Sequence, residues 1–120
     1  MFDQAYHHKQ LNRVIETLTF NQFNSFSVNK TFVEVENEDL RKSVWLASIL
    51  ANSSDEEHLK KVQLFGSLLF LQYGTQLHYA KAAYVLFSRI GNLTATRFLD
   101  IYLTMINPMI FLKKVWIQQN

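Results

Sequence analysis

The sequence predicts an all-α domain, and three observations lead to this prediction. Apolar residues recur along most of the chain at the i, i+3, i+4 spacing of an amphipathic helix. The 120 residues include only one proline and three glycines, so few positions interrupt a helix. Hydrophobic residues make up 48% of the chain and charged residues 18%, which excludes a disordered polyelectrolyte. We therefore expect a single domain over residues 1–120, with five to six helices arranged as antiparallel αα-hairpins.

The first helix is expected over residues 2–19, where four apolar residues form one stripe: Leu11, Val14, Ile15 and Leu18. An irregular connection is expected at about residues 20–36, because Phe and Val alternate there with Asn, Ser and Gln at neither helical nor strand spacing. We expect the phenylalanines of this connection to fill the helical core. A short extended piece at residues 31–35 is the alternative, since this stretch is rich in β-branched and aromatic residues.

Polar residues at helix starts delimit the second and third helices. Asn37 is expected to cap a second helix that runs to about Asn52. The third helix, about residues 54–73, follows an acidic run in which Ser53 with Glu56, or Ser54 with Glu57, has the capping-box spacing. Acidic residues gather at helix starts for electrostatic reasons, so we interpret this cluster as a cap and not as a catalytic carboxylate pair.

The third helix is apolar on most of its circumference and is expected to be largely buried. Its Gly66 would let a neighbouring helix approach closely. We expect Gly74 to end this helix in the left-handed conformation, and Thr75 to cap a fourth helix over residues 76–90. Gly91 is expected to terminate that helix.

Two further helices are expected, one from Asn92 to Ile106 and one at about residues 108–118. Residues 44–62 can also be laid on residues 84–102 at an offset of 40, so that Leu46 falls on Leu86. A period of about 40 residues is typical of HEAT or armadillo helical pairs. The sequence therefore leaves two architectures open, a compact bundle and a short HEAT-like stack.

A short helix junction lies within residues 81–99, KAAYVLFSRIGNLTATRFL, and consists of Arg89, Ile90, Gly91, Asn92, Leu93 and Ala95. It resembles a junction in the N-terminal helical regions of some bacterial superfamily 2 DEAD/DEAH-box helicases. The acidic cap around residues 53–58 looks similar too. The resemblance covers less than half of the chain, and Thr94 stands where the family pattern would have proline. It implies an accessory module outside the motor, because the chain has none of the helicase motor motifs.

No motif of a catalytic, metal or cofactor site is present in the sequence. The glycines are isolated, so there is no phosphate-binding loop. His7 and His8 are adjacent, point in different directions on a helix and cannot chelate one metal together. The chain has no cysteine, which fits a reducing cytoplasm. The longest run without charges, residues 62–79, is too polar for a membrane span. We expect a non-catalytic cytoplasmic protein without cofactor.

Charge is unevenly distributed along the chain. Residues 1–57 carry five Lys/Arg and nine Asp/Glu, whereas residues 58–120 carry seven Lys/Arg and only Asp100. Such a split serves either attraction within the fold or a basic face for an acidic partner. The candidate partner-binding residues lie in the basic part: Arg89, Asn92, Arg97, Lys113 and Lys114.

These observations favour a helical module that binds another protein. The alternatives are a nucleic-acid-binding helical domain, which also needs grouped basic residues, and a small regulatory or inhibitor protein that acts by surface occlusion. A homodimer would be a further way to cover the many Phe and Trp side chains.

Overall fold

The computed structural model describes residues 4–25, 32–91, 96–97 and 100 of the chain. Four helices lie in this part: α1 (Gln4–Asn24), α2 (Asn37–Leu50), α3 (Glu56–Tyr73) and α4 (Leu77–Ile90). The described residues contain no strand, which confirms the all-α class. They show four helices instead of the expected five to six. The two further helices expected after Gly91 lie almost wholly outside the described residues.

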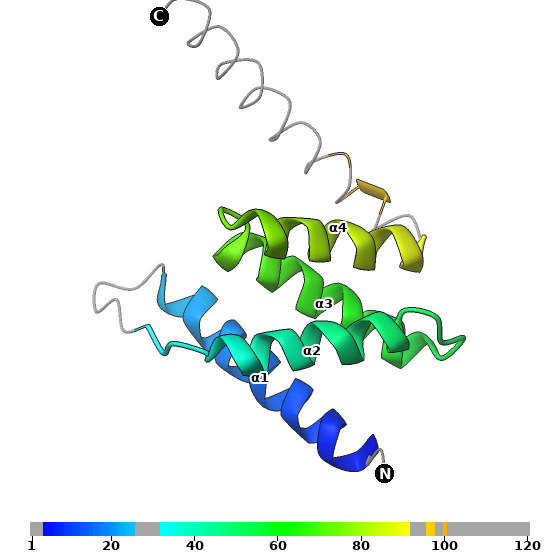
Figure 1. Cartoon of the computed structure of the whole chain (residues 1–120), viewed down its shortest axis with the longest axis horizontal. Coiled ribbons are helices and arrows are strands. Elements are labelled where there is room, and N and C mark those ends of the chain that lie inside the picture. The colour runs from blue at the N-terminus through cyan, green and yellow to red at the C-terminus, as the bar shows by residue number, and fades with distance from the viewer. Residues whose placement is uncertain (1–3, 26–31, 92–95, 98–99, 101–120) are drawn as a thin grey trace, which may run out of the picture.

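Consecutive helices alternate in direction, so α1 and α3 run one way while α2 and α4 run the other (Figure 1). The α3 helix lies at the centre and packs against all three others, most extensively against α4. The alternating directions agree with the expected antiparallel hairpins, whereas α4 lies at one side and packs mainly against α3. Part of the second copy of the proposed 40-residue repeat, at residues 92–95, 98–99 and 101–102, falls outside the described residues.

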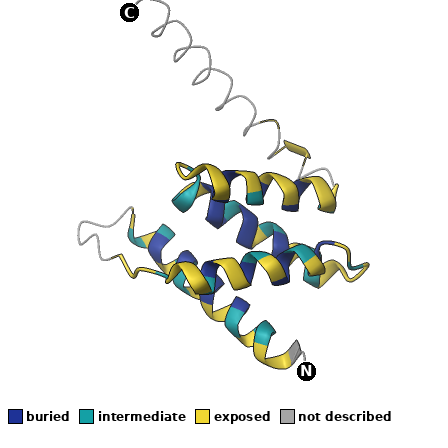
Figure 2. Ribbon diagram, in the orientation of Figure 1, coloured by how far each residue is buried: buried dark blue, intermediate teal, exposed yellow. Residues whose placement is uncertain are grey.

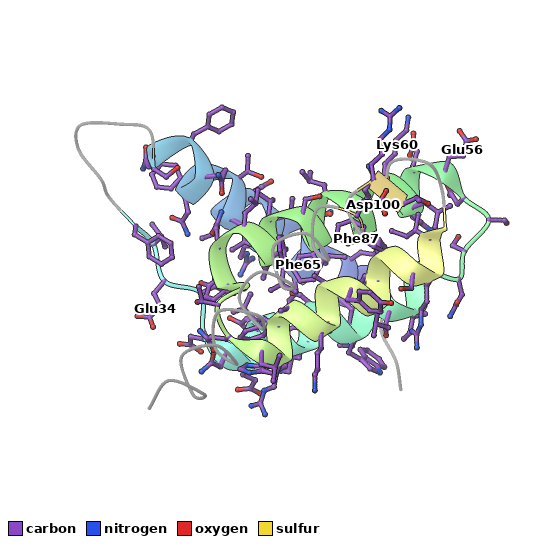
Figure 3. The ribbon with its side chains drawn as sticks, turned by 90° about the horizontal axis from the view of Figure 1, so that it is seen from above. Glu34, Glu56, Lys60, Phe65, Phe87 and Asp100 are labelled. Carbon is purple, nitrogen blue, oxygen red and sulfur yellow. The ribbon has the colours of Figure 1, made fainter. Side chains whose placement is uncertain are left out.

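The core lies between the inner faces of the four helices, and the exposed residues lie on their outer sides (Figure 2). The predicted stripe of the first helix is buried, with Leu11 and Leu18 fully enclosed. The largest fully buried side chains are Phe65 of α3 and Phe87 of α4 (Figure 3).

Gly66 makes the close contact between α3 and α4, as the sequence predicts. A Cβ atom at Gly66 would lie 3.2 Å from Cζ of Phe87, so only glycine leaves this ring its full space. The aromatic ring therefore fills the volume that a side chain on α3 would otherwise occupy.

The predicted irregular connection is wrong over its first part. The α1 helix continues to Asn24, because Asn21 extends the buried stripe one turn beyond Leu18. The described phenylalanines of the connection do not fill the core, since Phe20 is 47% exposed, Phe23 is 74% exposed and Phe32 is 57% exposed. Val35 packs against the core as a partly buried side chain. Phe26 and Val28 lie outside the described residues.

Two predicted caps are also wrong. The α2 helix begins at Asn37 itself, after Glu36, and the α4 helix begins after Gln76 in place of Thr75; neither preceding side chain caps its helix. The Asn37 side chain serves another purpose, because its Oδ1 accepts a hydrogen bond of 3.1 Å from the Tyr79 hydroxyl of α4. This bond ties the start of α2 to the start of α4.

At the start of α3 a cap is present, but it is not a capping box. Asp55 is the N-cap residue, and its Oδ1 accepts a hydrogen bond of 2.9 Å from the backbone N–H of Glu57. Ser53 lies outside the helix, where its Oγ accepts from the N–H of Asp55 at 3.0 Å. A charged carboxylate is favoured over a hydroxyl at this position by the positive end of the helix dipole.

The two predicted glycine terminators differ. Gly91 ends α4 with a φ of 64°, the left-handed conformation that glycine adopts without strain. Gly74 follows α3 in the right-handed conformation, with a φ of −67°, so its predicted left-handed conformation is wrong. Glycine is still required there, because a Cβ atom would collide with the backbone oxygen of Phe70.

Candidate interaction surface

A groove runs along the outside of the molecule between α1 and α3. Its lining comes from both helices, with Asn12, Ile15 and Glu16 on α1 and Lys60, Lys61 and Leu64 on α3, and its volume is about 360 Å³. We call this feature the α1–α3 groove. Because the two helices run in the same direction, each wall presents its side chains in the same order along the groove (Figure 1).

Polar contacts near both ends hold the two walls together. Towards the C-terminal ends of the helices, Nε2 of Gln72 donates to the backbone oxygen of Leu18 at 2.6 Å and lies 3.2 Å from Oε1 of Gln22. Towards the N-terminal ends, the rings of His8 and His58 face each other with centroids 5.4 Å apart. The walls are therefore fixed at two levels by the packing of α1 against α3.

Large apolar side chains continue the groove beyond its lined part. Phe20 and Phe23 follow Glu16 by four and seven residues on α1, and Leu71 follows Leu64 by seven on α3, so each set shares one helix face. These side chains are exposed: Phe20 by 47%, Phe23 by 74%, Leu64 by 48% and Leu71 by 59%. We call these four residues the apolar rim.

Sequence reasoning missed the apolar rim. It placed α3 inside the core on most of its circumference, but Leu64 and Leu71 are exposed. A signal was present, because Leu64 and Leu71 follow Lys60 by four and eleven residues and so share the face that carries this lysine. The hydrophobicity of a residue does not by itself show whether its side chain faces the core or the surface.

The charges at the α1–α3 groove are mainly positive. Lys60 and Lys61 contribute two cations to its lining and Glu16 one anion. In the described part of the chain no carboxylate lies within 4.0 Å of either lysine, whereas Lys42 on α2 pairs with Glu38 at 3.2 Å. Both groove lysines therefore keep their charge available for a ligand.

At the N-terminal end of the groove, Ser53, Asp55 and His58 lie together in a way that resembles a hydrolytic triad. Oγ of Ser53 lies 3.4 Å from Nδ1 of His58, and Nε2 of the same ring lies 4.0 Å from Oδ2 of Asp55. An activated nucleophile needs its base within about 3.2 Å. Ser53 and Asp55 also accept backbone N–H bonds at the start of α3, so this cluster serves the helix start.

At this end of the groove the pKa of His8 is displaced. Burial between α1 and α3 lowers the pKa of His8 from its ordinary value of 6.5, and the nearby charges of Lys61 and His58 lower it further. The imidazole is therefore neutral at neutral pH and resists protonation below it.

The predicted site residues are only partly described. Arg89 is exposed near the end of α4, where its Nη1 donates to the backbone oxygen of Ser48 on α2 at 3.2 Å. Arg97 is exposed as well. Asn92, Lys113 and Lys114 lie outside the described residues. Arg89 thus connects two helices in addition to presenting a charge.

Two negative findings apply to the described residues. They contain no group of three or more His, Cys, Asp or Glu side chains that could hold a metal ion. No helix among them has both the length and the apolar character that crossing a bilayer requires.

The comparisons with known proteins identified no relative of this chain. No protein-family model matches the chain, and no curated protein or solved structure shows significant similarity to it. We therefore infer the function from the α1–α3 groove and its surroundings.

Proposed function

We propose that this chain is a non-catalytic helical protein-interaction module, an accessory part of a larger assembly. The observation that supports this proposal is the apolar rim: Phe20, Phe23, Leu64 and Leu71 are exposed on the face that carries the α1–α3 groove. Burying one such side chain contributes about 1.5–3 kcal/mol. Large apolar side chains grouped on one face, beside a groove and polar residues, are typical of a protein-binding site.

The accessory role is part of the same proposal. It is supported by the helix junction around Gly91, which resembles the helical accessory regions of DEAD/DEAH-box helicases. A cytoplasmic location is proposed with it, because the chain has no cysteine and therefore contains none of the disulfides that are typical of oxidising compartments.

A nucleic-acid-binding domain is the second candidate, and the exposure of Arg89 and Arg97 favours it. Affinity for DNA or RNA that falls steeply between low and moderate salt would support this candidate, because counterion release dominates binding to phosphates. Affinity that does not change with salt, or no binding, would remove it.

Site-specific photocrosslinking tests the proposed interaction surface. A photoreactive phenylalanine analogue replaces Leu71 in the full chain, and a second protein carries it at Leu77 on α4, which is also exposed, by 64%. We expect a discrete crosslinked partner protein from position 71 and not from position 77. Leu64→Glu should abolish the product from position 71, because it places a charge in the groove. No product, or the same product from both positions, would contradict the proposal.

A further inference from the structure

We infer that the occupant of the α1–α3 groove is an amphipathic helix of a partner protein, with an apolar ridge and with Asp or Glu residues at one end of that ridge. This inference rests on the proposed function, because it names the partner of the same surface. It follows from the length of the groove walls and from the distribution of charge along them.

The walls fit a helix of about three turns. The groove and the apolar rim together extend from Asn12 to Phe23 on α1 and from Lys60 to Leu71 on α3. Each stretch covers eleven residue steps, which is about 17 Å of helix. Both walls place apolar side chains on the groove face. A partner helix laid between them would insert residues at i, i+3 or i+4 and i+7, as in other helix-in-groove complexes.

Charge differs between the two ends of the groove. Lys60 and Lys61 lie at the N-terminal end of the α3 wall, whereas Leu71 lies at the other end. Neither lysine has an ion-pair partner within 4.0 Å among the described residues. A partner with acidic residues opposite these lysines therefore gains electrostatic complementarity, which selects the partner and fixes the direction in which its helix lies.

A nucleic acid fits this groove less well than an acidic helix does. Ile15 and Leu64 contribute apolar lining, which can bury the apolar ridge of a helix but offers no contact to a phosphate backbone. Phosphate backbones are bound by several cations along a groove, whereas this one offers two lysines at one end.

Fluorescence anisotropy with synthetic peptides tests the inference on the full chain. Three labelled peptides of about 18 residues, or five turns, are compared. One has a leucine ridge with glutamates at one end, one has the same ridge with lysines, and one is a scrambled form of the first. We expect the glutamate peptide to bind at least about tenfold tighter than the other two at low salt.

Two charge variants provide the matched comparison. Lys60→Glu combined with Lys61→Glu should reverse the preference, so that the lysine peptide binds tighter. Lys81→Glu changes an exposed lysine on α4, away from the groove, and should leave the order unchanged. Reversal in the first variant alone supports the inference.

The other outcomes overturn it in ways that can be told apart. Equal binding of the glutamate and lysine peptides, lost with Leu64→Glu, overturns the charge assignment and leaves the interaction surface in place. If an oligonucleotide competes for the groove and binds tighter than the glutamate peptide, the groove is assigned to nucleic acid. Self-association in light scattering, abolished by Leu64→Glu, assigns it to a second copy of the chain. Crosslinks from position 71 to residues 101–120 of the same chain assign it to this segment. No peptide binding overturns the inference, while the photocrosslinking result separately decides the proposed function.

Discussion

The side chain of Asn21 pairs with both backbone polar groups of Val33. Its Nδ2 donates to the Val33 oxygen at 2.8 Å, and its Oδ1 accepts from the Val33 N–H at 2.9 Å. Asn21 is only 3% exposed although it is polar. The pair joins the last turn of α1 to the extended segment that leads into α2. The Asn21 amide thus supplies the two hydrogen bonds that a neighbouring strand would give the Val33 backbone.

Replacing this amide should destabilise the fold. Asn21→Ala removes two partly buried hydrogen bonds, each of which contributes about 1 kcal/mol, and we expect the free energy of unfolding to fall by roughly 2 kcal/mol. Urea denaturation measures this loss. Asn12→Ala on the same helix changes an exposed asparagine and should alter stability by less than about 0.5 kcal/mol. Equal effects of the two substitutions would contradict the role of the pair.

The contact between Gly66 and Phe87 gives a second prediction. Gly66→Ala gains about 1 kcal/mol of helix propensity but brings a methyl group to 3.2 Å from the ring, so its net effect on stability should be small. Gly66→Val adds further volume against a buried ring and should cost roughly 2 kcal/mol. Thermal unfolding of the two variants tests this order. A gain in stability from Gly66→Val would show that the α3–α4 interface is looser than the structure indicates.

Helical periodicity predicted α4 within one residue, because Tyr79, Ala83 and Leu86 place apolar side chains on a single face. It missed the last turn of α1, where the buried position that an apolar residue usually fills is taken by Asn21. The partner of that side chain is the backbone of Val33, twelve residues away, and a pairing with backbone leaves no trace in the pattern of side chains.

The same limit applies to the candidate site. The sequence favoured a protein-binding module, but the candidate binding residues that it indicated belong to neither α1 nor α3: Arg89, Asn92, Arg97, Lys113 and Lys114. The α1–α3 groove depends on α1 and α3 lying side by side, and their spacing in the chain does not reveal this. Local sequence identified the helices, whereas their arrangement determined which apolar residues stayed exposed.

Acidification should weaken the contact between α1 and α3 through His8. Its pKa in the folded protein lies below the value of 6.5 expected when unfolded, mainly because of burial. As pH falls through 6.5, the unfolded chain takes up a proton that the folded chain resists, so stability declines until the pH drops below the folded pKa. The groups facing this ring are His58 and Lys61 on α3, and Asp55 lies beyond His58.

Urea denaturation midpoints, measured at a series of pH values from above 6.5 downwards, test the prediction. His8→Gln should reduce the loss of stability on acidification, because the substituted residue does not titrate. A pH profile that His8→Gln does not change would exclude His8 as its source.

Arg89 and Arg97 should contribute little to folding. Changing both to Ala removes one exposed hydrogen bond, from Arg89 to the Ser48 oxygen, and should lower stability by about 1 kcal/mol or less. Circular dichroism and thermal unfolding measure this effect. Arg97→Ala alone serves as the control for the loss of one charge. Unfolding of the double variant would show that the arginines are structural and would remove them as candidates for binding a partner.

Two leucines on the same helix separate stability from binding. Leu69 of α3 is fully buried, so Leu69→Ala should lower the free energy of unfolding by about 2–5 kcal/mol through lost contacts and a cavity. Leu64 is 48% exposed, so Leu64→Glu should change it by less than about 1 kcal/mol. The new carboxylate would also follow Lys60 by four residues, where an ion pair offsets part of any loss. A folded Leu64→Glu protein that no longer crosslinks its partner from position 71 would locate binding at the α1–α3 groove. A Leu64→Glu protein that unfolds would instead assign Leu64 to the core.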